Sequence, residues 1–308
     1  MARFPVASRA RTAGDAHRRR APGGCRYTVA MIGLSVVAPA HNEEENVAPL
    51  VEEIVAALDP TGIEYEIVII DDGSTDSTPQ RLAALLGRFD RLRVIRMTQT
   101  PPGRGNGQSA AFHAGFRASR GALLALLDAD LQNDPADIPA MLQRLAETGA
   151  DVVQGDRSAN RRDSFIRRAS SWVGRTARRL LLGDSIRDTG CSLRVLRRAV
   201  ALSIPLEFRG MHRFIPVTAR HLGHRVVEMP VRHRPRTSGN TKYGIWNRAL
   251  PGLIDCFAVR WMHARRRPTA WSAVEPGARP AQDSEITAGP VEARRSTEAA
   301  KSLEAPSA

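Results

Sequence analysis

Short apolar runs alternate with amphipathic stretches through the first half of the chain. Runs rich in Val, Ile and Leu predict strands at residues 34–38, 65–70, 91–97, 122–127 and 151–154. Between them, apolar residues recur at three- and four-residue steps and predict helices at 43–58, 77–87, 108–119 and 135–148. This alternation predicts an α/β fold with a mostly parallel sheet and helices on both faces. Ligands of such sheets bind beyond the carboxyl ends of the strands.

The second half of the chain is less regular. It predicts helices at 165–182, 209–222 and 243–263 and a strand at 225–231. The last helix carries an apolar stripe. A basic cluster follows it directly and consists of Arg265, Arg266 and Arg267. The stripe consists of Trp246, Leu250, Leu253, Phe257 and Trp261. Such a helix either packs on the domain or lies in a membrane interface, and the sequence leaves both possibilities open.

Both ends of the chain differ in composition from the region between them. Residues 1–30 carry seven Arg and one Asp, and residues 268–308 are rich in Pro, Ala, Ser and Glu. We expect both segments to be disordered, with a basic arm for anionic lipid as the alternative for the first. The predicted boundaries are therefore a catalytic domain at 31–240 and an amphipathic juxtamembrane helix at 241–267. The sequence has no run of 18 apolar residues, so we expect any membrane contact to be peripheral.

Charge and cysteine content restrict the function classes. The formal net charge of +13 indicates an anionic partner (a nucleic acid, an acidic lipid or a phosphorylated substrate), although a genome that favours Arg codons would have the same effect. Aromatic residues make up only 5% of the chain, which argues against a binding surface built from stacked rings. The three cysteines lie far apart without CxxC spacing, so the sequence predicts neither a disulfide framework nor a zinc site, and a reducing compartment fits.

An acidic cluster follows the fourth predicted strand. Its sequence is Asp128-Ala129-Asp130-Leu131-Gln132. If the chain stays extended, residues 128, 130 and 132 point to one side, and their oxygen atoms suit Mg²⁺ or Mn²⁺, which in turn binds a diphosphate. The alternative is a solvated acidic turn.

Two more polar loops end the neighbouring strands. The second strand runs into Asp71-Asp72-Gly73-Ser74-Thr75-Asp76, where an aspartate could accept from a ribose hydroxyl or a base N–H and Ser74 or Thr75 could cap a helix. The first strand ends in Pro39-Ala40-His41-Asn42-Glu43. By contrast, Gly103-Arg104-Gly105-Asn106-Gly107-Gln108 has no Lys-Ser/Thr after it, and we interpret it as a flexible loop before a helix.

These motifs, in this order, resemble glycosyltransferase family 2 with a GT-A fold. Four further segments are similar to those of one subgroup of this family, the polyprenyl-phosphate glycosyltransferases. The resemblance covers roughly residues 33–262. The segments are 128–135 (DADLQNDP), 154–157 (QGDR), 187–194 (RDTGCSLR) and 236–244 (RTSGNTKYG).

The resemblance implies roles for individual residues. The nucleotide-contacting positions are Pro39, His41 and Glu43 in the first loop, Ile70 and Asp72 at the base and ribose, and Asp128 and Ala129 at the diphosphate. The metal positions are Asp128, Asp130 and Gln132, with Mg²⁺ or Mn²⁺ as cofactor. Arg157 matches an arginine near the sugar phosphates, and Arg167 and Ser171 match a pair that holds the acceptor phosphate. Arg236 and Lys242 match a basic pair on a mobile loop that closes over the diphosphate.

The implied reaction is a single displacement with inversion, from a GDP- or UDP-linked sugar to a polyprenyl phosphate at the cytoplasmic face of an anionic membrane. A phosphate monoester is largely ionised near neutral pH and needs no general base. If the chain itself does not bind the membrane, a membrane protein partner is needed. The sequence leaves open which sugar and nucleotide are used: GDP-mannose, UDP-glucose and UDP-uronic or amino sugars all fit.

Two alternatives belong to other classes. One is an enzyme of the same fold that glycosylates a hydroxyl group, with Asp188 as the base. The other is a basic protein that binds nucleic acid or an anionic membrane. The chain has no helix-turn-helix, zinc-finger or RNA-binding aromatic signature, so we expect no nucleic acid partner.

Overall fold

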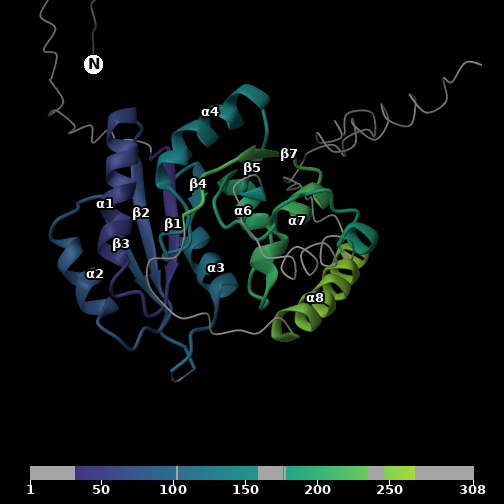
Figure 1. Ribbon diagram of the computed structural model, residues 1–308, viewed down its shortest axis with the longest axis horizontal. Coiled ribbons are helices and arrows are strands. Elements are labelled where there is room, and N and C mark those ends of the chain that lie inside the picture. Colours follow the sequence, from purple (N-terminus) through teal and green to yellow (C-terminus); the bar gives the residue numbers. More distant parts are fainter. Residues whose placement is uncertain (1–31, 102, 159–175, 177, 235–245, 268–308) are drawn as a thin grey trace, which may run out of the picture. The chain divides into compact units, whose positions relative to one another are not determined.

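The computed structural model describes residues 32–101, 103–158, 176, 178–234 and 246–267, and for 246–251 it describes the helical backbone alone. A seven-stranded sheet, ordered β3-β2-β1-β4-β6-β5-β7, forms its centre (Figure 1). The strands are β1 (Leu34–Ala40), β2 (Tyr65–Asp71), β3 (Leu92–Arg96), β4 (Leu123–Leu126), β5 (Val152–Asp156), β6 (Arg194–Arg197) and β7 (Val226–Pro230).

The sheet is mostly parallel, which confirms the predicted fold class. The pairs β1–β2, β1–β4, β2–β3 and β5–β7 are parallel, whereas β6 runs antiparallel to both β4 and β5. Sequence patterning missed β6 and the short helix after it, α6 (Arg198–Ser203). The arginines at both ends of β6 obscure its apolar centre, Val195 and Leu196, which lies buried in the sheet.

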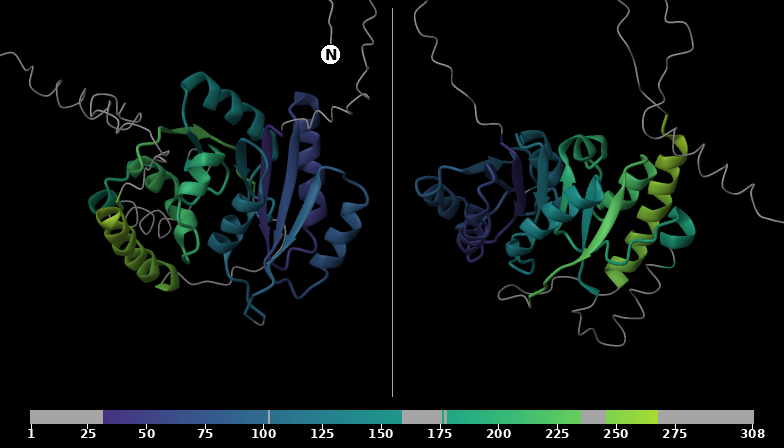
Figure 2. Two further views of the ribbon diagram at one scale, coloured as in Figure 1. Left: turned by 180° about the vertical axis from the view of Figure 1, so that it is seen from behind. Right: turned by 90° about the horizontal axis from the view of Figure 1, so that it is seen from above.

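Helices cover both faces of the sheet, as the alternation predicts (Figure 2). One apolar layer packs α1 (Val47–Leu58), α2 (Thr78–Leu86) and α4 (Ile138–Thr148) against the sheet. The other packs α3 (Gln108–Ala118), α6, α7 (Ile215–His221) and α8 (Trp246–Arg265). Side chains alternate between the layers along each strand: in β1, Val36 and Ala38 enter the first layer and Val37 the second. Short 3-10 helices lie at Asp59–Thr61, Pro135–Asp137 and Met211–Phe214.

The helix α1 begins later than its apolar periodicity predicts. The predicted start at residue 43 is wrong, because residues before Val47 bind the loop after β2 instead. The backbone N–H of Glu43 donates to the Thr78 hydroxyl at 2.9 Å, and the N–H of Glu44 donates to Asp76 at 3.3 Å. These bonds hold the loop after β1 against the loop after β2.

The last helix, α8, contacts the domain along one side. Cys256 and Val259 are buried in the second layer, and the ring of His263 stacks on that of His221 in α7 at 3.9 Å. The opposite side leaves Phe257 and Trp261 exposed by 55% and 63%, together with Leu253 and Ile254. None of the described helices combines the length and the apolar content that crossing a bilayer requires.

Candidate active site

Three polar loops meet at one edge of the sheet because β1, β2 and β4 are adjacent and parallel. Ala40 pairs with Asp71 where β1 and β2 end, and Val37 pairs with Leu126 where β4 ends. The loops that begin with His41, Asp72 and Asp128 therefore leave the sheet on the same side. This is the edge where ligands of doubly covered parallel sheets bind.

The first two loops are hydrogen-bonded into one unit. His41 donates from Nδ1 to the carbonyl of Asp72 at 2.7 Å, since a carbonyl only accepts. Asn42 adopts a left-handed conformation (φ 57°), in which its N–H donates to the hydroxyl of Ser74 and its side chain accepts from the N–H of Thr75. The strained backbone at Asn42 is thus held from both sides.

The glycine-rich loop lies directly before α3, as predicted, and two of its backbone N–H groups bond to Asp72. The Asp72 carboxylate accepts from the N–H of Asn106 at 2.9 Å and from that of Gly107 at 2.7 Å. At Gly105 a Cβ atom would lie 2.3 Å from an Asp72 carboxylate oxygen, so only glycine allows this approach. Gly107 has a φ of 97°, which also favours glycine.

Other residues of the predicted nucleotide site vary in exposure. The side chain of Ile70 is fully buried against Gly115 of α3 and belongs to the core beneath the site. Ala129 is also buried, whereas Pro39 and Glu43 are half-buried. The Asp71 carboxylate accepts from the N–H of Ser74 at 2.9 Å and so shapes the second loop.

The chain does not stay extended after β4, which corrects the geometric basis of the predicted metal site. Leu131 adopts a left-handed conformation (φ 59°), and a carboxylate oxygen of Asp130 accepts from the N–H of Gln132 at 3.3 Å. The backbone carbonyl of Gln132 accepts from the N–H of Arg234. A turn, and not strand alternation, therefore sets the positions of residues 128, 130 and 132.

The two aspartates of this turn are close enough to influence each other. Burial and the neighbouring charge of Asp130 raise the pKa of Asp128 to about 6. The amide of Gln108, the first residue of α3, donates to a carboxylate oxygen of Asp128. In the part of the chain that the structure describes, no group of three or more His, Cys, Asp or Glu side chains could hold a metal. Two carboxylates still fit Mg²⁺ or Mn²⁺, since such ions often take the rest of their ligands from water and substrate phosphates.

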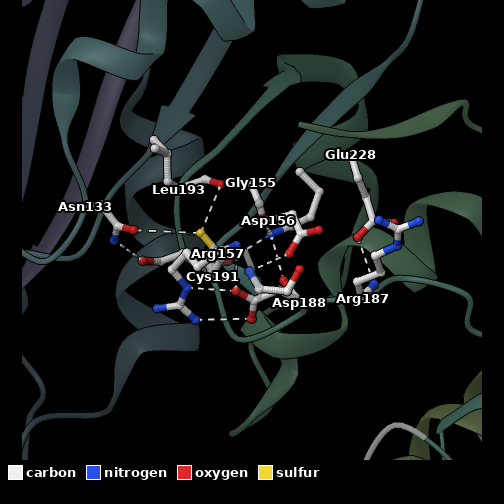
Figure 3. Close-up of polar contacts among 12 residues, drawn as sticks. Asn133, Gly155, Asp156, Arg157, Arg187, Asp188, Cys191, Leu193 and Glu228 are labelled. Carbon is white, nitrogen blue, oxygen red and sulfur yellow. Dashed lines mark hydrogen bonds and ion pairs between the residues drawn. The ribbon is translucent and has the colours of Figure 1, made fainter. Parts of the chain in front are cut away.

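Arg157 is paired with Asp188 in a buried, two-pronged contact (Figure 3). The Nε and Nη2 atoms of Arg157 donate to the two carboxylate oxygens at 2.8 and 3.2 Å, and the backbone N–H of Arg157 donates as well. Burial disfavours the guanidinium charge, but Asp188 outweighs this effect and raises the pKa of Arg157. The nearby amide of Gln154 donates to three backbone carbonyls and orders the same loop.

A small polar cavity of about 60 Å³ opens beside Asp128. Its lining consists of Gln108, Phe112, Asp128, Thr189, Gly190, Ser192, Arg194, His212 and Arg213. Arg194 is 2% exposed and donates to the carbonyls of Cys191 and His212, and burial lowers its pKa to about 10. Burial and the charges of Arg213 and Arg194 lower the pKa of His212 to about 3, so this ring is neutral. The sequence assigns no function to either residue. Arg194 lies at the end of the segment 187–194, which supports only the family resemblance, and no sequence pattern distinguishes His212.

Four predicted site residues, Arg167, Ser171, Arg236 and Lys242, lie outside the described residues.

Comparisons with known proteins show the family and the fold of this chain. The family model described as glycosyl transferase family 2 matches residues 35–204. A dodecaprenyl-phosphate galacturonate synthase of Rhizobium johnstonii is 37% identical over 250 residues, which are 80% of this chain and 72% of that protein. An undecaprenyl-phosphate 4-deoxy-4-formamido-L-arabinose transferase of Edwardsiella ictaluri is 37% identical over 233 residues, 75% of this chain and 70% of that one. Among solved structures, glucosyl-3-phosphoglycerate synthase from Mycobacterium tuberculosis, in complex with Mg²⁺ and UDP, shares the fold with a TM-score of 0.54 at 20% identity, over 74% of this chain and 79% of that one.

Proposed function

The chain belongs to glycosyltransferase family 2, and on this premise we propose that it transfers a sugar from a nucleotide diphosphate carrier to the phosphate group of a polyprenyl lipid. The observation that carries the proposal is the joint position of Asp72, Asp128 and Asp130 at one edge of the sheet, in a chain whose 37%-identical relatives are named polyprenyl-phosphate sugar transferases. The donor is a GDP- or UDP-linked sugar, and the reaction inverts the anomeric carbon.

The donor side of the site suits a nucleotide diphosphate. The loops after β1 and β2 and the glycine loop form a hydrogen-bonded frame for the nucleoside, in which His41 is half-buried and fixed by Asp72. Asp128 and Asp130 would hold Mg²⁺ or Mn²⁺, which supplies positive charge to the departing diphosphate. Arg236 and Lys242 would add positive charge from their loop.

The acceptor side favours a phosphate over a hydroxyl group. A hydroxyl acceptor needs a free carboxylate as general base, and the candidate, Asp188, is bound through both oxygens to Arg157. A phosphate monoester needs cationic surroundings instead. Arg194 and Arg213 line the cavity beside Asp128, and Arg167 and Ser171 would complete this side of the site.

The outer side of α8 supports a membrane contact. Of the predicted apolar stripe, Leu253, Phe257 and Trp261 face away from the domain, while Trp246 and Leu250 have no described side chains. The Arg265 guanidinium lies 6.0 Å from the Trp261 ring, and Arg266 and Arg267 follow. An exposed apolar face with a basic end is typical of helices that lie in an anionic membrane interface, and we infer that the enzyme binds the cytoplasmic face in this way.

Product analysis tests the proposal directly. Purified enzyme is incubated with GDP-mannose, UDP-glucose, UDP-uronic and UDP-amino sugars, a short-chain polyprenyl phosphate and Mn²⁺ or Mg²⁺, and glycolipid is identified by mass spectrometry and its anomeric configuration by NMR. We expect an inverted sugar phosphodiester that forms only with a divalent metal. Transfer to the free prenyl alcohol or to a soluble glycan, with none to the phosphate, would support the hydroxyl-acceptor alternative.

A further inference from the structure

Three of the four polar groups of His212, its backbone N–H, its backbone carbonyl and its ring Nδ1, are hydrogen-bonded. It belongs to the short helix Met211–Phe214, far in sequence from the acidic loops, and it lines the cavity beside Asp128. Its backbone N–H donates to the Ser109 hydroxyl at 3.1 Å, and its backbone carbonyl accepts from Arg194 at 2.8 Å. Its ring Nδ1 lies 2.9 Å from the same Ser109 hydroxyl.

These contacts set the tautomer of the ring. The Ser109 hydroxyl accepts from the His212 backbone N–H and is buried, at 3% exposure, so its own hydrogen needs an acceptor. Among the hydrogen bonds of the described residues that acceptor is the ring Nδ1. A neutral imidazole that accepts at Nδ1 carries its single hydrogen on Nε2. Burial and two cationic neighbours, Arg213 and Arg194, disfavour a second ring proton. Nε2 is thus a hydrogen-bond donor, and among the described residues no side chain or carbonyl accepts from it.

We propose that His212 is a substrate-contacting residue whose Nε2–H donates to a phosphate oxygen bound in the cavity beside Asp128. The cavity pairs this donor with the cationic groups of Arg194 and Arg213. Such a set of donors recognises an anionic oxygen acceptor. A neutral donor beside two cations adds a directed hydrogen bond without a further charge to desolvate.

This inference rests on the proposed function for its choice of ligand. The phosphate oxygen could belong to the leaving nucleoside diphosphate or to the phosphate of the prenyl acceptor. Both lie at the reacting centre, so binding of each ligand is measured separately.

Two isosteric substitutions separate substrate contact from a structural role. In His212→Gln the side-chain amide nitrogen takes the place of the donor Nε2, whereas in His212→Asn the side-chain amide oxygen takes the place of Nδ1 and can accept from Ser109. We expect His212→Gln to keep kcat/KM within about threefold of wild type and His212→Asn to lose at least about tenfold, as for a lost hydrogen bond to a charged group. His224, which faces Asp151 at the surface, provides the control pair His224→Gln and His224→Asn, for which we expect wild-type rates.

Binding measurements identify the ligand. Calorimetric titration with UDP and GDP reports the donor side, and the melting-temperature shift caused by a short-chain prenyl phosphate reports the acceptor side. The ligand that His212 contacts is the one whose binding weakens in His212→Asn and is kept in His212→Gln. These two binding assays do not depend on catalytic transfer, so a failed transfer assay in the wild type would count against the proposed function alone.

Three results would overturn the role of His212. The first is a larger loss of kcat/KM in His212→Gln than in His212→Asn, which is expected if only the structural bond to Ser109 matters. The others are equal losses in both variants and wild-type kcat/KM in both. NMR of ¹⁵N-histidine-labelled wild-type protein gives a test without mutation. We expect the Nε2–H tautomer from pH 5 to 8 and a shift of this ¹⁵N–¹H signal on addition of the bound ligand. An Nδ1–H tautomer, or a signal that neither ligand moves, would also refute it.

Discussion

Replacing Asp188 by Asn removes the negative charge from the buried pair with Arg157 at nearly constant shape. The side chains of Arg157 and Asp188 are 9% and 4% exposed, so the remaining guanidinium cannot turn to water. Breaking a buried pair by removing one partner costs about 3–5 kcal/mol. For a domain of this size, 1 kcal/mol changes the melting temperature by about 2–4 °C, and we therefore expect Asp188→Asn to lower it by about 6–20 °C.

A second ion pair supplies the matched control. Arg197 also contacts an aspartate through its Nε atom, at 3.2 Å from a carboxylate oxygen of Asp151, but these side chains are 49% and 29% exposed. Surface pairs of this kind contribute about 0–1 kcal/mol, so Asp151→Asn should lower the melting temperature by at most about 4 °C. Differential scanning calorimetry of the two variants and the wild type measures both effects. Equal changes in the two variants would refute the inference that burial makes the Arg157–Asp188 pair important for stability.

The same variant tests the chemistry of transfer. If the acceptor is a phosphate, the folded fraction of Asp188→Asn should keep kcat within about tenfold of wild type, because no general base is needed. A general base contributes about 10²–10⁴-fold. A loss of that size in folded Asp188→Asn, with normal nucleotide affinity, would identify Asp188 as a base and contradict the proposed acceptor class.

Four further predictions address the metal site, its protonation, the basic loop and the membrane surface. Asp130→Ala should abolish transfer while circular dichroism stays unchanged, and near-normal activity with Mg²⁺ or Mn²⁺ would exclude Asp130 from the metal site. Burial raises the pKa of Asp128 in the folded protein to about 6, above the usual value of 3.8. Ionisation of Asp128 therefore lowers the stability of the fold above about pH 6, and it has no such effect below about pH 4, where the carboxyl is protonated in both the folded and the unfolded state. Asp128→Asn should therefore raise the melting temperature of the metal-free protein at pH 7.5, and a gain that persists at pH 4 would contradict this assignment. Arg236→Ala and Lys242→Ala should lower kcat at least about tenfold with little loss of nucleotide affinity, as expected for groups that act on the transition state, whereas equal losses in both would indicate a plain binding loop. Full-length protein should sediment with anionic liposomes at low salt and be released by high salt or by Ser at residues 265–267, and protein that stays in the supernatant would mean that a membrane partner is needed.

Local sequence patterns determined the fold class of this protein and the edge of the sheet at which its site lies. Alternating apolar runs and amphipathic stretches predicted the order of strands and helices through residue 156, because each element buries a face with its own period. Polar loops after three apolar runs, two of them beginning with aspartate, indicated a shared ligand edge, since parallel strands end on the same side. The motifs also indicated glycosyltransferase family 2, which the comparisons confirm.

Contacts between distant residues decided the details of the site, and local periodicity carries no signal for them. The glycine loop approaches Asp72, more than thirty positions earlier, which accepts from two of its N–H groups. Asp188 looks like a free base in the sequence, but the fold buries it against Arg157. The tautomer of His212 depends on Ser109, which lies 103 positions away. The two side chains meet only because α3 and the helix Met211–Phe214 pack on one face of the sheet. The sequence thus determined which chemical groups stand at the ends of the strands, whereas the packing of the elements decided which of those groups are held in internal bonds and which are left to face a ligand.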